Sequence, residues 1–157
     1  MGKKTKMIIL VIVAALIVVT VLVVGRIFGR TKAGESEIVL NIQLDLKEDI
    51  GLLIIDSDIC GRKASGGVSN ADKSMIRMDE RLAWSIDKQN YENTPDVVEL
   101  TLRFTVVTEY CDPNYENIYP EEYLIPMDAI VFSARFGEAY SIRITGDKTN
   151  GYQAGLE

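Results

Sequence analysis

The stretch 98-VELTLRFTV-106 shows the clearest strand pattern in this chain of 157 residues. Its Val, Leu and Phe residues alternate strictly with Glu, Thr and Arg, so every second side chain is apolar. A period of two is typical of a β-strand that buries one face and exposes the other. The sequence around this strand should therefore supply further strands with complementary apolar faces.

The same alternation recurs on both sides of this stretch. We expect residues 38–46 and 50–56 to pair as a hairpin, and residues 130–136 and 140–144 to pair as another around Gly137-Glu138. Residues 76–86 predict either one long strand or a hairpin broken at Asp79-Glu80. A last strand is expected at residues 152–156, and loops rich in Gly or Pro at 58–73, 89–96 and 112–127.

About seven short amphipathic strands predict an all-β domain, folded as an antiparallel β-sandwich. Trp84 lies between Cys60 and Cys111, an order that resembles immunoglobulin domains. The resemblance implies an immunoglobulin-like architecture and does not extend to membership of that family, because the gap from Cys60 to Trp84 is too long. Trp84 is expected to be an ordinary core residue.

The N-terminal region predicts a membrane anchor. Met7 to Val24 is an apolar run of 18 residues without a charge or a proline. At about 1.5 Å per residue a helix of this length nearly spans the hydrocarbon core of a bilayer. The alternative is a cleaved signal peptide, but the run is longer than the usual apolar region and no clean cleavage site follows it. We expect a cytoplasmic basic tip at 1–6, a transmembrane helix at 7–25, a linker at 26–36 and the β-domain at 37–157.

The charges bear on orientation and partners. Lysines precede the apolar run and Arg26, Arg30 and Lys32 follow it, so the positive-inside count is nearly tied; the short N-terminal tail favours a domain outside the cytoplasm. Residues 34–157 hold 23 carboxylates against 11 Lys and Arg, a balance that disfavours nucleic acid. The chain has no N-x-S/T sequon, which fits a bacterial origin.

The composition excludes several chemistries. The chain has no histidine, which removes Ser-His-Asp and Cys-His catalysis and the usual zinc sites. No phosphate-binding or dinucleotide-binding glycine motif is present. We therefore expect a protein that is not an enzyme and needs no cofactor; a small carboxylate-dependent hydrolase is the remaining enzymatic alternative.

Two segments are candidates for binding. Asp56 and Asp58 resemble the start of a calcium loop, but Cys60 stands where a third oxygen ligand belongs, so no metal site is predicted and these two acids are only the nearest match. Residues 112–123, called the tyrosine segment below, form the other candidate. Its proposed binding residues are Tyr115, Tyr119, Tyr123, Glu116, Glu121 and Glu122. Loop tyrosines give rigid amphipathic contact area; the alternative is a crossover loop that covers the core edge.

Cys60 and Cys111 each follow an expected strand, and they can form a disulfide only if those strand ends lie at the same end of the domain. Two free thiols are the alternative.

Together these features predict a single-pass protein of the cell membrane whose extracytoplasmic domain binds a protein or cell-surface partner. The bilayer itself is a partner through residues 7–25. The second hypothesis is a structural accessory subunit of a membrane complex.

Overall fold

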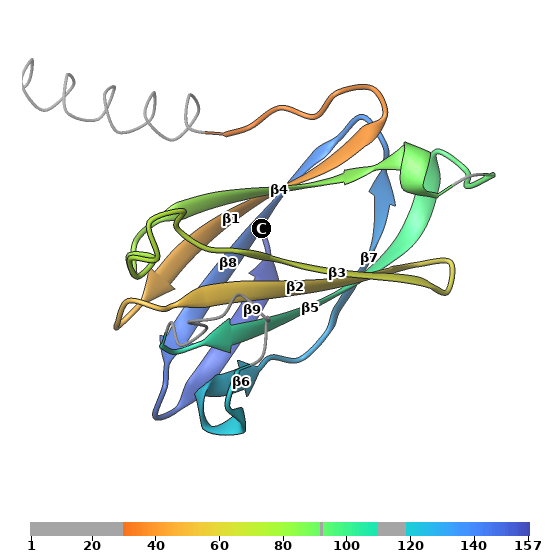
Figure 1. Cartoon of the computed structure of the whole chain (residues 1–157). Coiled ribbons are helices and arrows are strands. Elements are labelled where there is room, and N and C mark those ends of the chain that lie inside the picture. Colours follow the sequence, from red (N-terminus) through yellow and green to blue (C-terminus); the bar gives the residue numbers. More distant parts are fainter. Residues whose placement is uncertain (1–29, 92, 110–118) are drawn as a thin grey trace, which may run out of the picture. The chain divides into compact units, whose positions relative to one another are not determined.

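The computed structural model describes residues 30–91, 93–109 and 119–157. Thr31–Glu157 forms one compact unit built of two β-sheets (Figure 1). The expected membrane helix at 7–25 lies outside the described residues. Within the part of the chain that the structure describes, no helix is long and apolar enough to cross a membrane.

The first sheet has four strands in the order β4-β1-β8-β9. They are β1 (Glu37–Leu46), β4 (Arg81–Asp87), β8 (Ala139–Asp147) and β9 (Gly151–Leu156). β1 lies in the interior of this sheet, antiparallel to β4 and parallel to β8. Leu40 therefore has Trp84 opposite it on one side and Tyr140 on the other.

The second sheet has five strands, with β3, β2, β5 and β6 in order and β7 also paired to β5. They are β2 (Leu52–Ile59), β3 (Arg62–Val68), β5 (Val97–Val107), β6 (Leu124–Pro126) and β7 (Ile130–Arg135). All pairings in this sheet are antiparallel. Two short 3-10 turns, η1 (Lys88–Asn90) and η2 (Glu121–Tyr123), complete the described elements.

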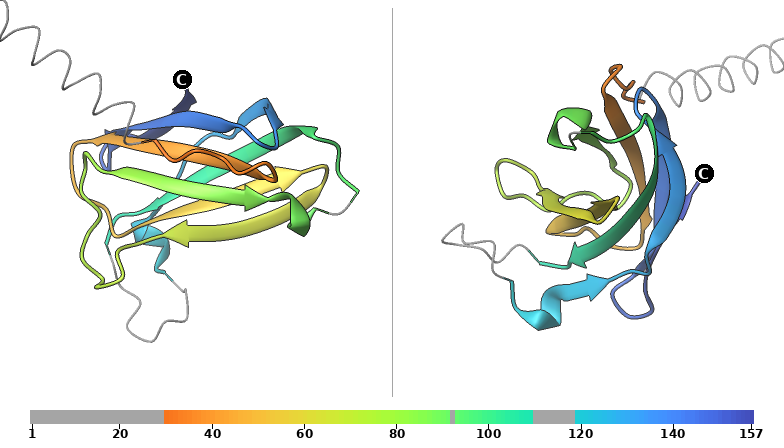
Figure 2. Two further views of the ribbon diagram at one scale, coloured as in Figure 1. Left: turned by 90° about the horizontal axis from the view of Figure 1, so that it is seen from above. Right: turned by 90° about the vertical axis from the view of Figure 1, so that its right-hand side faces the viewer.

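The two sheets lie face to face and bury their apolar faces against each other (Figure 2). Alternate residues of each strand point into this layer, which is what the period of two requires. Its largest fully buried side chains are Phe104, Ile38, Leu40, Ile42, Leu44, Ile50, Leu53, Ile55, Ile59, Ile76, Leu100 and Leu102. The indole of Trp84, which is half-buried, packs onto the backbone of Gly66 on the facing sheet.

Several predictions from the sequence are confirmed. The domain is all-β, its sheets are largely antiparallel, and the stretches 38–46, 98–106 and 152–156 are strands. The last of these strands, β9, forms a hairpin with β8, in which Asp147 lies opposite Gly151.

The two hairpins that the sequence predicted do not form. β1 and β2 follow each other in sequence but belong to different sheets, and so do β7 and β8. The link between β1 and β2 crosses from one sheet to the other, where Ile50 forms a bridge with Ile76. Gly137 makes the second crossing: its backbone has φ +95°, and its N–H donates to the carbonyl of Glu37 on β1 at 2.7 Å.

Two expected loops and one expected strand also need correction. Residues 58–73 contain β3, residues 112–127 contain β6, and 76–86 are neither one strand nor a hairpin, because only Arg81–Asp87 joins the sheet. β3 escaped detection because its sequence, RKASGGV, has no apolar alternation. Of its own side chains Val68 packs against the core, and Trp84 of β4 covers the inner face at Gly66.

The strand order departs from that of an immunoglobulin constant domain, in which the first two strands pair within one sheet. The two-layer sandwich stands. The described part of the expected linker is attached to it: the amide side chain of Asn41 accepts a hydrogen bond from the Thr31 N–H at 2.8 Å and donates to the Thr31 carbonyl at 3.0 Å.

Candidate functional site

The outer face of the five-stranded sheet carries two rows of polar side chains. Residues directly opposite each other in an antiparallel pair share a face of the sheet. One row runs across three strands as Lys63, Asp58 and Thr101, and the next as Ser65, Asp56 and Arg103. These six side chains point away from the core because Ile55, Ile59 and Leu102 take the inward positions between them.

The two rows line a groove of about 340 Å³, called the polar groove below. Its lining residues are Asp56, Ser57, Asp58, Lys63, Ala64, Ser65, Thr101 and Arg103. A volume of this size is at the lower end of the range for sites that bind small molecules or single peptide side chains. Lys63, Ser65 and Arg103 are exposed, whereas Asp56, Asp58 and Thr101 are half-buried.

The charged side chains of the groove have formal charges that cancel, but they form no ion pairs with one another within the described structure. Two carboxylates face two cations across the strands, yet none of the ion pairs among the described side chains joins Asp56 or Asp58 to Lys63 or Arg103. Asp58 accepts a hydrogen bond from the Gly61 N–H at 2.8 Å, which fixes one of its oxygens in the β2–β3 turn. The remaining charged atoms can bind groups of either sign from outside.

This arrangement bears on the calcium-like pattern at Asp56 and Asp58. The described residues hold no group of three or more His, Cys, Asp or Glu that could surround a metal ion. Calcium prefers six or more oxygen ligands. Here Lys63 and Arg103 occupy the positions opposite the two acids, and their positive charges would repel a metal cation.

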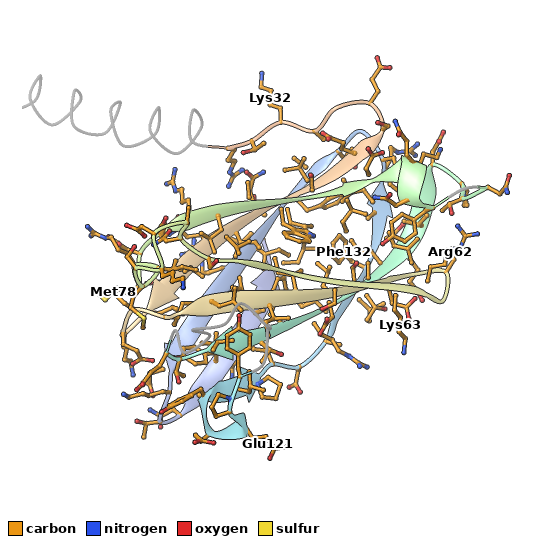
Figure 3. The ribbon with its side chains drawn as sticks, viewed as in Figure 1. Lys32, Arg62, Lys63, Met78, Glu121 and Phe132 are labelled. Atoms are coloured by element: carbon orange, nitrogen blue, oxygen red, sulfur yellow. The ribbon has the colours of Figure 1, made fainter. Side chains whose placement is uncertain are left out.

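Of the tyrosine segment the structure describes residues 119–123, and none of these lines the groove. Tyr115 and Glu116 lie outside the described residues. Tyr123 ends the turn η2 and its carbonyl accepts a hydrogen bond from the Thr108 N–H at 2.9 Å, beyond the end of β5. Tyr119 and Tyr123 are half-buried, and Glu122 is exposed. Glu121 is also exposed (Figure 3).

The strands that precede the two cysteines end at opposite ends of the sheet. Cys60 follows Ile59, which lies opposite Leu100, whereas the other end of β5 lies opposite Leu52. Cys60 is exposed and free. Cys111 lies outside the described residues, so the disulfide stays a prediction, and the direction of the strands favours two free thiols.

A second polar cluster joins the β1–β2 link to the β8–β9 turn. The Lys47 ammonium donates to Asp147 Oδ2 at 2.7 Å, and the backbone N–H groups of Thr149 and Asn150 donate to Asp147 Oδ1 at 3.0 and 2.8 Å. The hydrogen bond from Lys47 is the main reason that the pKa of the Asp147 carboxyl lies well below its usual range. The same hydrogen bond raises the pKa of Lys47.

Tyr152 extends this cluster. Its hydroxyl donates to Glu48, and burial followed by this hydrogen bond raises the pKa of the phenol. Lys47 and Asp147 bind each other and Tyr152 binds Glu48, so we assign the cluster to the stability of the turns and not to binding.

Sequence reasoning singled out Asp56 and Asp58 but missed Lys63 and Arg103. One local signal could have found Lys63. A two-residue turn at Cys60-Gly61 places residue 58 opposite residue 63, and both turn residues have positive φ, 53° and 81°, as a type I′ hairpin requires. Arg103 has no such signal, because the register between β2 and β5 is not local.

Comparison with known proteins adds little to this description. No protein-family model matches the chain, and no curated protein matches it in sequence. Among solved structures it is similar to listeriolysin O (7% identity, TM-score 0.38, 77% of this chain and 22% of that one), pneumolysin (8%, 0.34, 78% and 23%) and intermedilysin (7%, 0.37, 77% and 23%). The chain thus spans less than a quarter of each. Likeness at this level carries no argument about function.

Proposed function

We propose that this protein is a non-catalytic binding module, held at the cell membrane by residues 7–25, and that its polar groove contacts the partner. The observation that carries the proposal is the groove itself: four charged side chains of both signs, aligned by the strand register and free of ion pairs with one another within the described structure.

The chemistry of the groove selects the kind of partner. The described lining residues include no aromatic side chain on which a sugar ring could stack, and their formal charges cancel, which disfavours a polyanion such as nucleic acid. Two acid–cation pairs, each with a hydroxyl group at the end of its row, suit a polar surface of a folded protein or peptide. Complementary charges of this kind set specificity and the rate of association more than raw affinity.

The membrane anchor supports the same proposal. Thr31 is hydrogen bonded to Asn41 of β1, so few residues separate the apolar run from the domain. A short tether raises the effective concentration of the domain toward any partner in the same membrane. The domain is proposed to lie outside the cytoplasm.

Site-specific photocrosslinking tests the proposal. A benzophenone amino acid is placed at Thr101 in the full-length protein, which is then irradiated in its native membranes. The matched control carries the same group at Thr145, on the outer face of the four-stranded sheet. We expect a discrete crosslinked partner from position 101 and not from 145, and its loss in the variants Asp56→Lys and Arg103→Asp.

The double variant with Asp56→Arg and Arg103→Asp sharpens the test. It keeps opposite charges across the two strands but exchanges their places, so the fold is retained while recognition is not. Equal crosslinking at both positions, or crosslinking at 101 that all three variants leave unchanged, would exclude the groove. Replacing residues 7–25 by an unrelated membrane helix should preserve the crosslink; its loss would favour the accessory-subunit alternative.

A further inference from the structure

We propose that β3 is a docking edge at which an extended acidic segment of the partner adds to the five-stranded sheet as a further strand. This inference rests on the proposed binding function and specifies the chemistry and conformation of the partner.

The first step is the position of β3. It pairs with β2 on one side and has no strand on the other within the described structure. Ala64 is exposed although its side chain lies on the face that elsewhere packs against the other sheet. The tip of the β2–β3 hairpin therefore extends beyond the core and is open at residues 62–65.

The second step concerns the backbone groups of this edge. In a hairpin with a two-residue turn, the residues that flank the turn form a hydrogen-bonded pair, here Ile59 with Arg62. Along the two strands such pairs alternate with pairs that are not hydrogen bonded to each other, whose backbone groups point away from the partner strand. Lys63, Ser65 and Gly67 are the outward members of β3. Their N–H and C=O groups are thus presented as the template for another strand.

The third step is the charge of this edge. Arg62 and Lys63 are both exposed and project from opposite sides of the hairpin tip (Figure 3). Neither takes part in an ion pair or side-chain hydrogen bond among the described residues. Basic residues at a sheet edge discourage indiscriminate pairing, and they also select for a strand that carries carboxylates opposite them.

The fourth step is steric. Residues 64–67 are Ala, Ser, Gly and Gly, so no large side chain stands beside the outward-pointing backbone groups. Small residues within a strand often mark a place where a second backbone approaches closely. An added strand would also extend the row that contains Ser65, Asp56 and Arg103, which connects this edge with the polar groove.

The test uses full-length protein in detergent micelles and two synthetic peptides of nine residues with blocked ends. One alternates threonine with glutamate, and the other alternates threonine with lysine. We expect the acidic peptide to bind at least about tenfold more tightly by fluorescence anisotropy. Hydrogen exchange should slow at the amides of Lys63, Ser65 and Gly67 when it binds.

Two variants make the result specific. Ser65→Pro removes an outward N–H but no hydrogen bond to β2, so it should abolish peptide binding while thermal unfolding stays close to that of the Ser65→Thr control. The double variant Arg62→Glu with Lys63→Glu should reverse the preference toward the lysine peptide. Binding that Ser65→Pro leaves intact, or no discrimination between the peptides, would overturn the proposal.

A second copy of this chain is the competing occupant. Self-association in sedimentation experiments that Ser65→Pro abolishes would assign the edge to a homodimer and overturn the acidic partner. Arg103→Asp separates this inference from the proposed function. This variant should remove the crosslink at position 101 and leave peptide binding at β3 unchanged. Failure of the proposed function and failure of this inference can therefore be told apart.

Discussion

The indole of Trp84 lies so close to the backbone of Gly66 that a methyl group on this glycine would stand 2.2 Å from ring carbon Cη2. The contact joins β4 of one sheet to β3 of the other. Between residues 62 and 67 β3 has no large apolar side chain, and the tryptophan supplies the apolar surface that packs against this part of the strand.

Gly66→Ala should therefore destabilise the domain. The added carbon forces the indole to move, and overpacking of this kind costs about 1–3 kcal/mol. Gly155→Ala is the matched control, because a carbon added there meets nothing within 4 Å, and it should change the free energy of unfolding by less than about 0.5 kcal/mol. Denaturant unfolding followed by circular dichroism measures both variants. Equal stability of the two would show that Trp84 does not hold β3.

Asp147 should make stability depend on pH in the acid range. Its pKa is lowered in the folded state, so its contribution is present above the unfolded value of about 3.9 and is lost as the pH falls through the lower folded pKa. Asp147→Asn should be less stable at neutral pH and should lack this part of the acid-induced loss. Unfolding midpoints from pH 7 down to about pH 1.5 give the comparison, and parallel curves for the two proteins would contradict the assignment.

Two free thiols per chain are expected. The strand ends before Cys60 and Cys111 lie at opposite ends of the sheet, so the strands do not bring the two residues together. A thiol reagent added to protein that was purified without reductant and then denatured should titrate two groups, and Cys60→Ser should leave one. A count of zero in the wild type would establish the disulfide.

The contribution of the exposed acids of the tyrosine segment to recognition can be tested with variants that leave the stability of the domain nearly unchanged. Glu121→Lys with Glu122→Lys changes charge on an exposed turn and should alter stability by less than about 0.5 kcal/mol. Tyr123→Ala should cost more, because this side chain is half-buried. If the acid changes leave the partner crosslink at position 101 intact, the segment covers the core edge and does not take part in recognition.

Local patterns predicted most of the strands but little of their pairing. The alternation at 98–106 is decisive because one face of β5 is buried along its whole length. The predicted pairings of β1 with β2 and of β7 with β8 were wrong because strands that are neighbours in sequence can belong to different sheets. Nothing in residues 47–51 indicates that the chain passes from one sheet to the other there. The sequence did not predict β3 for a different reason. Its own residues show no apolar alternation, and the apolar side chain that packs at Gly66 is Trp84 of the other sheet.

In the candidate site, too, residues placed by local sequence signals were predictable and those placed by non-local strand pairing were not. Asp56 and Asp58 were visible because their spacing is local. Lys63 was accessible through the turn at Cys60-Gly61, and only the register between β2 and β5 reveals Arg103. A site assembled across strands can be read from sequence only as far as the hairpins that build it.

The parallel pairing of β1 with β8 sets the order in which this domain can form. Val39 lies opposite Ala139, a hundred residues later in the chain. At about 5–20 residues per second, β1 leaves the ribosome several seconds before its parallel neighbour exists. During that interval an apolar strand with an open edge is exposed beside a hydrophobic N-terminal segment. High contact order thus makes slow folding, and a need for protection from aggregation during synthesis, a built-in property of the topology.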